Sequence, residues 1–77
     1  MSEATLFVKD KCPSCDIAEK ILKHAGVEYT KINVTSYPDI VEKFTKLGIK
    51  SVPVTQMDGG LLIGGVNNLK KHLGIKV

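Results

Sequence analysis

The sequence has no arginine and no tryptophan, and aromatic residues make up only 5% of its 77 positions. Arginine and aromatic side chains are the usual means of reading bases and gripping phosphates, so their scarcity argues against a nucleic-acid-binding protein. The net charge of +3 comes from lysines that are scattered along the chain and form no tract. We therefore expect a loose preference for anionic partners and no nucleic acid among them.

Long apolar runs are absent as well. No stretch approaches 18 consecutive apolar residues, and the first residues lack the basic start and apolar segment of a signal peptide. We expect a cytoplasmic protein with no membrane partner. The 43% hydrophobic and 25% charged residues are typical of a globular protein. A chain this short predicts one domain over residues 1–77, and we expect a monomer.

Cysteine is also scarce, and the only two, Cys12 and Cys15, form a C-P-S-C motif. A disulfide that closes so short a loop adds only about 2 kcal/mol of stability, against more than about 4 for a loop of about 60 residues. Structural zinc needs four ligands, and His24 and His72 lack the spacing that would complete a site. We therefore interpret the pair as redox-active, with no resident metal. A shared zinc site and an iron–sulfur carrier stay open as alternatives.

Hydrophobic periodicity predicts alternating strands and helices. The short β-branched and aromatic run 4–8 is typical of a buried strand. A helix follows from Pro13, which suits a first helical position, to a stop at Gly26. A second strand is expected over 27–34. The next helix is expected to be capped by Ser36 and to stop at Gly48.

The last third of the chain predicts a hairpin and a short helix. A strand within 49–57 is joined through Asp58-Gly59 to a strand at 61–63. Asn67 or Asn68 is expected to cap the final helix. The element order is β-α-β-α-β-β-α, which is an α/β class with a mixed four-stranded sheet and three flanking helices. Two apolar stripes are expected in the core, namely Ile17, Ile21 and Leu22, and Ile40, Phe44 and Leu47.

The cysteine motif lies between a strand and a helix, which predicts that Cys12 stands at the helix N-terminus. Unpaired N–H groups there carry partial positive charge and favour a thiolate, which lowers a cysteine's pKa. Lys9 and Lys11 act in the same direction. Cys15, one turn further on, should be more shielded. We therefore expect Cys12 to be the attacking nucleophile and Cys15 the resolving thiol.

Three segments together resemble the glutaredoxins of the thioredoxin superfamily, over roughly residues 5–73. They are C-P-S-C at 12–15, Ser-Val-Pro at 51–53, and Ile-Gly-Gly-Val-Asn-Asn-Leu at 63–69. The resemblance implies a thioredoxin fold and a thiol–disulfide oxidoreductase that acts on protein disulfides or glutathione mixed disulfides. It also implies glutathione as co-substrate with the glutathione reductase system as donor, and no bound cofactor.

The same resemblance implies a cis peptide before Pro53, with the Val52 backbone facing the nucleophile and pairing with substrate. Asn67 and Asn68 would hold one glutathione carboxylate, and Lys9 the other. The alternatives are an edge-strand proline, asparagines that only cap a helix, and a solvated lysine. The implied substrate- or glutathione-binding set is Lys9, Pro13, Ser14, Val52, Pro53, Gly65, Asn67 and Asn68.

Some residues depart from the family pattern. Ser14 stands where an aromatic residue is usual, and Asn67 and Asn68 stand where acidic or hydroxyl residues are common. The chain is also as short as the redoxins that resemble glutaredoxins but take electrons from thioredoxin reductase. The alternative is therefore a redoxin of that kind, with ribonucleotide reductase as a client. His24 and His72 are expected at the surface.

Overall fold

Four short strands form one mixed sheet in the order β2-β1-β3-β4. The computed structural model describes residues 3–49 and 52–74. The elements in chain order are β1 Glu3–Val8, α1 Pro13–His24, β2 Glu28–Asn33, a 3-10 turn Val34–Ser36, α2 Pro38–Lys46, β3 Val54–Gln56, a 3-10 turn Asp58–Gly60, β4 Leu62–Gly64 and α3 Val66–His72. This is the predicted order, and the thioredoxin-like architecture is confirmed.

The strand pairing follows from the connections. The helix α1 returns the chain beside its starting strand, so β1 and β2 are parallel, with Glu3 opposite Glu28 and Val8 opposite Asn33. The strand β3 runs antiparallel to β1, and β4 runs antiparallel to β3. The strand that precedes the cysteines is therefore central and is held on both sides.

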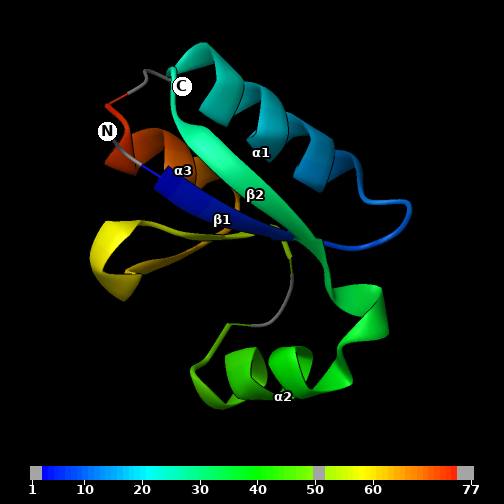
Figure 1. The fold of residues 1–77 in the computed structure, drawn as a ribbon. Helices are drawn as coiled ribbons and strands as arrows, with labels where there is room; N and C mark the ends of the chain where they lie inside the picture. The colour runs from blue at the N-terminus through cyan, green and yellow to red at the C-terminus, as the bar shows by residue number, and fades with distance from the viewer. Residues whose placement is uncertain (1–2, 50–51, 75–77) are drawn as a thin grey trace.

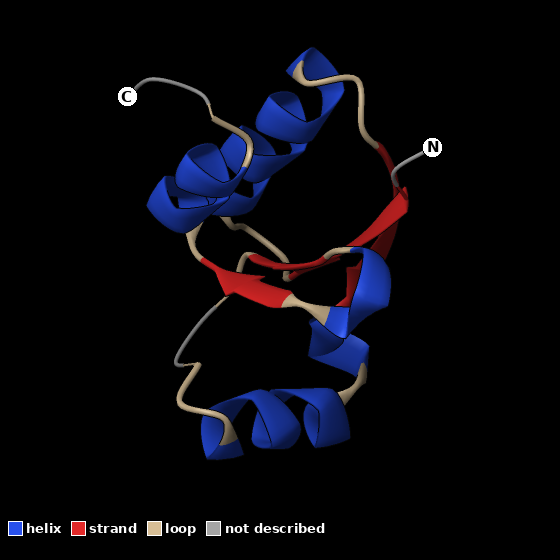
Figure 2. Ribbon diagram, turned by 90° about the vertical axis from the view of Figure 1, so that its left-hand side faces the viewer, coloured by secondary structure: helices blue, strands red, loops and turns tan. Residues whose placement is uncertain are grey.

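The helices lie on opposite faces of this sheet. Figures 1 and 2 show α1 and α3 on one face and α2 alone on the other. Successive residues of β1 serve both faces: Leu6 and Val8 pack with α1 and α3, and Phe7 packs edge-on against Phe44 of α2, with ring centroids 5.0 Å apart. The helix with the cysteines thus lies on the more extensive of the two cores.

Several details of the sequence interpretation are wrong. Ile17 and Leu47 were expected in the core but are 46% and 57% exposed. Leu47 follows the last residue of α2, where the helical spacing no longer holds. The residue before α2 is Tyr37, which makes no side-chain capping bond, and Ser36 ends the preceding 3-10 turn. Gly65, with φ +83°, precedes α3, so neither asparagine caps it.

The hairpin is confirmed, but its strands are shorter than expected and its connection is longer. The strand expected within 49–57 is regular only over Val54–Gln56, and a 3-10 turn, Asp58–Gly60, replaces a two-residue turn. Ser51 and the tail 75–77 lie outside the described residues. His24 and His72 end their helices and are exposed, as expected. Among the described helices, none is long and apolar enough to cross a membrane.

Candidate functional site

The two cysteines form a disulfide at the start of α1. Cys12 is the residue before the helix, in extended conformation, and Pro13 takes the first helical position. The Cα atoms of Cys12 and Cys15 are 5.2 Å apart, because the first helical turn brings residues of this spacing onto one side. The Cys15 backbone N–H donates to Cys12 Sγ at 3.2 Å. The sulfur of Cys12 therefore replaces the usual oxygen acceptor of a helix N-cap.

The two sulfurs differ in access. Cys15 is only 3% exposed and belongs to the core cluster that also contains Ala18 and Leu22. Cys12 is half-buried, and Pro13 and Ser14 are exposed. An incoming disulfide can therefore reach Cys12 from solvent but not Cys15. This geometry suits the predicted roles of nucleophile and resolving thiol, which stay predictions.

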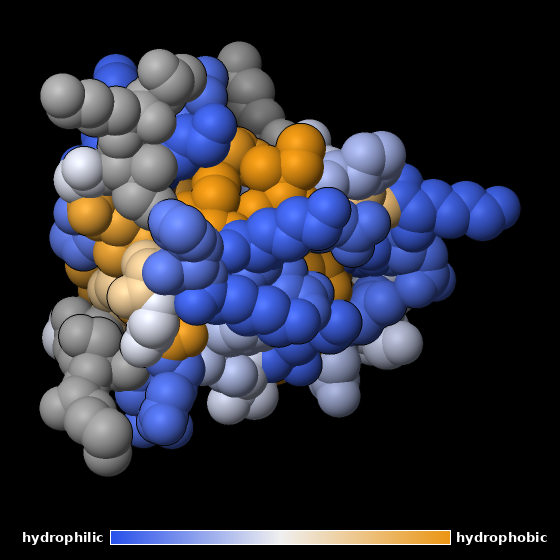
Figure 3. Space-filling model, turned by 90° about the horizontal axis from the view of Figure 1, so that it is seen from above, coloured by the Kyte–Doolittle hydropathy of each residue, from blue (hydrophilic) through white to orange (hydrophobic). Residues whose placement is uncertain are grey.

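A helix N-terminus and two lysines lie near Cys12, in a cleft that Asp10, Asp16 and Glu19 also line. Cys12 stands at the N-terminus of α1, where the helix dipole is positive and the Cys15 backbone N–H donates to its sulfur. Lys9 and Lys11 are exposed, and neither forms an ion pair within the described part of the chain. Figure 3 shows hydrophilic side chains projecting outward at the end of the molecule where the loop between β1 and α1 lies. Both features favour a thiolate over a thiol at Cys12.

A cis peptide bond joins Val52 and Pro53, as the resemblance implies. The Gly65 N–H donates to the Pro53 carbonyl at 2.9 Å, which ties this loop to the segment before α3. Val52 is half-buried and packs against the cluster that holds both cysteines. The structure thus brings Val52, Pro53 and Gly65 together, with Val52 packed on the same core cluster as the cysteines.

Asn67, Asn68 and Lys9 are the residues that the resemblance assigns to the two glutathione carboxylates. Asn67 and Asn68 are exposed within α3, and the Asn68 side-chain amide donates to the Gly64 carbonyl at 2.9 Å. Lys9 lines a cleft of about 330 Å³ with the two cysteines. None of Val52, Pro53, Gly65 or the asparagines lines that cleft. Of the predicted glutathione-binding residues, this cleft therefore contains Lys9, and the role of the whole set stays a prediction.

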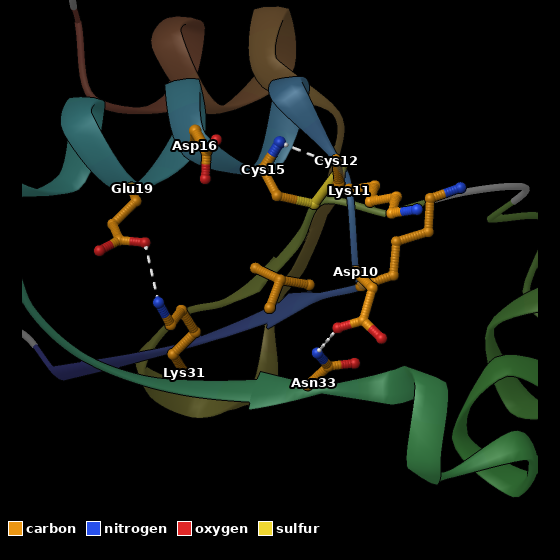
Figure 4. Close-up of a pocket in the computed structure, with 10 residues that line it drawn as sticks. Asp10, Lys11, Cys12, Cys15, Asp16, Glu19, Lys31 and Asn33 are labelled. Atoms are coloured by element: carbon orange, nitrogen blue, oxygen red, sulfur yellow. Dashed lines mark hydrogen bonds and ion pairs between the residues drawn. A yellow bond between two sulfur atoms is a disulfide. The ribbon is translucent and has the colours of Figure 1, made fainter.

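The cleft lies between the first turns of α1 and the ends of β1 and β2 (Figure 4). Its polar lining includes a charged group that the sequence interpretation missed. Glu19 Oε1 lies 3.4 Å from the ammonium of Lys23, and Glu19 Oε2 lies 3.3 Å from that of Lys31 on β2. The spacing of Glu19 and Lys23 is readable from the sequence. The contact with Lys31 is not, because it depends on how α1 lies across the sheet.

Tyr29 on β2 completes this group. A hydrogen bond from the Tyr29 hydroxyl is the largest influence on the Glu19 carboxyl and holds its pKa below the usual value, with help from Lys31 and Lys23 and against partial burial. Burial, together with that hydrogen bond, raises the pKa of Tyr29 to about 12. Glu19 therefore fastens the cysteine-bearing helix to the sheet. Across the described residues, no three His, Cys, Asp or Glu side chains cluster as metal ligands would.

The Glutaredoxin family profile matches residues 4–62. The chain is 30% identical over 54 residues to the glutaredoxin-like protein NrdH of Lactococcus lactis subsp. cremoris, which is 70% of this chain and 75% of the relative.

Two solved structures share the fold. The glutaredoxin-like NrdH-redoxin of Escherichia coli, described for its thioredoxin-like activity profile, has a TM-score of 0.71 at 24% identity and covers 82% of each chain. A buckwheat glutaredoxin in complex with glutathione has a TM-score of 0.73 at 25% identity, and covers 92% of this chain and 68% of its own. The fold is thus common to a redoxin described for a thioredoxin-like activity profile and to a glutaredoxin in complex with glutathione.

Proposed function

Because this chain belongs to the glutaredoxin family and is a glutaredoxin-like thiol–disulfide oxidoreductase, we propose that Cys12 and Cys15 reduce protein disulfides and are restored by thioredoxin reductase. The sequence interpretation gave reduction by thioredoxin reductase as its alternative. We now prefer it to the glutathione-dependent activity that was first expected.

The reaction divides between the two thiols. The Cys12 thiolate attacks one sulfur of the client disulfide, so that a mixed disulfide forms and the second client sulfur leaves as a thiolate. Cys15 then loses its proton and attacks Cys12 Sγ, which releases the first client sulfur and closes the Cys12–Cys15 disulfide. The client gains two electrons and two protons. The reductase dithiol reverses this exchange with two electrons from NADPH.

The short reach between the thiols makes the second step fast. Because Cys15 is one helical turn from Cys12, its sulfur is already within bonding distance of the sulfur it must attack. Burial of Cys15 keeps it from reacting with solvent oxidants or with the client directly. Cys12 alone therefore meets partners.

The observation that carries the choice of donor is the relationship to the NrdH proteins. The geometry supports it in two ways. The Asn68 side-chain amide is already bonded to the Gly64 carbonyl, which takes up one of the donors that would meet a glutathione carboxylate. In addition, Lys9 lies in a cleft that the cis-proline loop and α3 do not line. These features disfavour a two-ended clamp for glutathione. By the same relationship, we propose ribonucleotide reductase as one client.

A paired assay of NADPH oxidation tests the proposal. One arm contains thioredoxin reductase and insulin as the protein disulfide. The other contains glutathione, glutathione reductase and the mixed disulfide of glutathione and β-mercaptoethanol. We expect turnover in the first arm and at most a tenth of that rate in the second. The Cys12→Ser variant is the blank for both arms.

Two results would overturn the proposal. Turnover with glutathione that equals or exceeds that with thioredoxin reductase would restore the glutathione-dependent activity. Silence in both arms, with thiols that are verified as reduced and reactive, would favour the metal or iron–sulfur carrier. In that case freshly purified protein should be coloured or absorb in the visible range.

A further inference from the structure

The loop that leads into Cys12 is held by side chains of the neighbouring strand. The parallel ladder between β1 and β2 ends at the pair Val8 and Asn33, so residues 9–11 continue without a strand partner. Beyond the end of the ladder, three hydrogen bonds involving side chains link this loop, the end of β2 and the 3-10 turn that follows it. They form a closed set between Asp10, Asn33 and Thr35, which we name the Asp10–Asn33–Thr35 clasp.

Each member of the clasp contacts the other two. The Asn33 side-chain amide donates to Asp10 Oδ1 at 2.7 Å. The Thr35 backbone N–H donates to Asn33 Oδ1 at 2.9 Å, and the Asp10 backbone N–H donates to Thr35 Oγ1 at 3.3 Å. Asn33 therefore serves both as the residue before the 3-10 turn and as the anchor of the loop. Figure 4 shows the bond between Asn33 and Asp10 below the disulfide.

The residue between the clasp and the nucleophile has a backbone that needs such support. Lys11 has φ of +53°, and no other non-glycine residue in the described part of the chain has a positive φ. A lysine disfavours this conformation because its Cβ crowds the backbone. Lys11 directly precedes Cys12 and directly follows Asp10, so the clasp fixes the loop one residue before the turn.

The clasp also controls local charge. Asp10 lies between Lys9 and Lys11 in sequence, and a free carboxylate there would offset their positive field at Cys12. In the structure the Asp10 carboxylate is turned to Asn33, and Lys11 extends away from it (Figure 4). Asp10, Lys11 and Asn33 all line the cleft that contains the cysteines.

From this geometry we propose that Asp10, Asn33 and Thr35 are positioning residues for the redox reaction. The clasp holds Lys11 in its left-handed conformation and keeps the Asp10 carboxylate away from Cys12, so that the thiolate of Cys12 stays exposed and stabilised. The inference rests on the thiol chemistry of Cys12 and is independent of the electron donor.

The test measures Cys12 itself and needs no reductase. Fully reduced protein is alkylated with iodoacetamide at pH 7, and the site is confirmed by peptide mass. Asn33→Ala removes two of the three clasp bonds, and Thr35→Val removes the third. We expect alkylation of Cys12 to slow by roughly three- to tenfold in Asn33→Ala. The released Asp10 carboxylate, although partly screened by solvent, can then approach Cys12, and the loop 9–11 loses its anchor. The thiol–disulfide equilibrium against a dithiothreitol buffer should shift in the same variant.

A matched control removes a similar exposed hydrogen bond elsewhere. The Thr45 hydroxyl donates to the Val41 carbonyl at 3.0 Å on α2, on the opposite face of the sheet. Thr45→Ala should leave the alkylation rate and the dithiol equilibrium unchanged. This control separates the loss of any surface hydrogen bond from the loss of the clasp.

A double-mutant cycle tests the role of the Lys11 backbone. Glycine adopts positive φ without a Cβ penalty, so Asn33→Ala should cost less in a Lys11→Gly background than in a Lys11→Gln background, although both remove the charge. The proposal is overturned if Asn33→Ala and Thr35→Val lower only the melting temperature and leave Cys12 reactivity and the dithiol equilibrium at wild-type values. Should Asn33→Ala not fold, Thr35→Val alone decides the matter.

Discussion

The contact between Tyr29 and Glu19 makes a quantitative prediction about how the cysteine-bearing helix is fastened to the sheet. Tyr29→Phe removes only the hydroxyl and keeps the ring that packs against the core. The variant should be less stable than the wild type at neutral pH by about 1 kcal/mol, because the Glu19 carboxylate loses a hydrogen bond in a partly exposed setting.

The difference in free energy of unfolding between the wild type and Tyr29→Phe should then shrink and reverse as the pH rises. The pKa of Tyr29 is raised from 10.0 to about 12 in the folded state, so its stabilising contribution is complete below pH 10 and is lost as the pH rises towards 12. At about pH 11 the unfolded tyrosine is mostly ionised and the folded one is not, which costs the wild type roughly 1.4 kcal/mol relative to about pH 8. Tyr29→Phe has no hydroxyl to ionise, so its stability does not fall for this reason.

Urea unfolding followed by far-ultraviolet circular dichroism, with the disulfide intact, measures both proteins at intervals between pH 8 and pH 11. The two stability curves should converge and cross near the upper end of this range. Parallel curves would refute the reasoning, because they would mean that the Tyr29 hydroxyl neither is buried nor contacts Glu19.

Three further predictions concern stability. Leu22→Ala, at a fully buried position, should cost about 3–5 kcal/mol in urea unfolding. At Gly48 and Gly65 an added Cβ meets nothing within 4 Å, so the backbone conformation sets the cost. Gly48→Ala should cost about 1 kcal/mol through its positive φ. Gly65→Ala should cost about 1–3 kcal/mol, because φ +83° with ψ 169° is almost confined to glycine, and only this variant should slow client reduction. The Glu19 pKa is lowered, so the advantage of the wild type over Glu19→Gln should be present at pH 6 and fade as the pH falls below about 4.5.

Much of the fold is predictable because local signals agree with the final packing. Pro13 and Gly26 mark the ends of α1, and the apolar run of β1 is buried on both faces of the sheet. The errors lie where packing across the molecule decides. Ile17 has helical spacing but stays exposed, and Asn67 lies inside α3 because Gly65, with its positive φ, already turns the chain.

The candidate site also has parts that the sequence predicts and parts that depend on the fold. The position of Cys12 before α1 follows from a strand, a short loop and a proline, all of which are visible in the sequence. The clasp does not follow from it, because Asp10 and Asn33 are 23 residues apart and meet only through the register of β1 and β2. Likewise, the sequence places Asp10 between two lysines, and only the fold shows that its carboxylate is bonded to Asn33.

The most direct test of the central claim is to trap the covalent intermediate. Reduced Cys15→Ser and Cys12→Ser variants are each mixed with a protein disulfide such as insulin, and the products are separated without reductant and identified by mass. We expect a stable mixed disulfide through Cys12 in the Cys15→Ser variant and none in Cys12→Ser, since Cys15 is buried. A comparable complex through Cys15 in the Cys12→Ser variant would contradict the account.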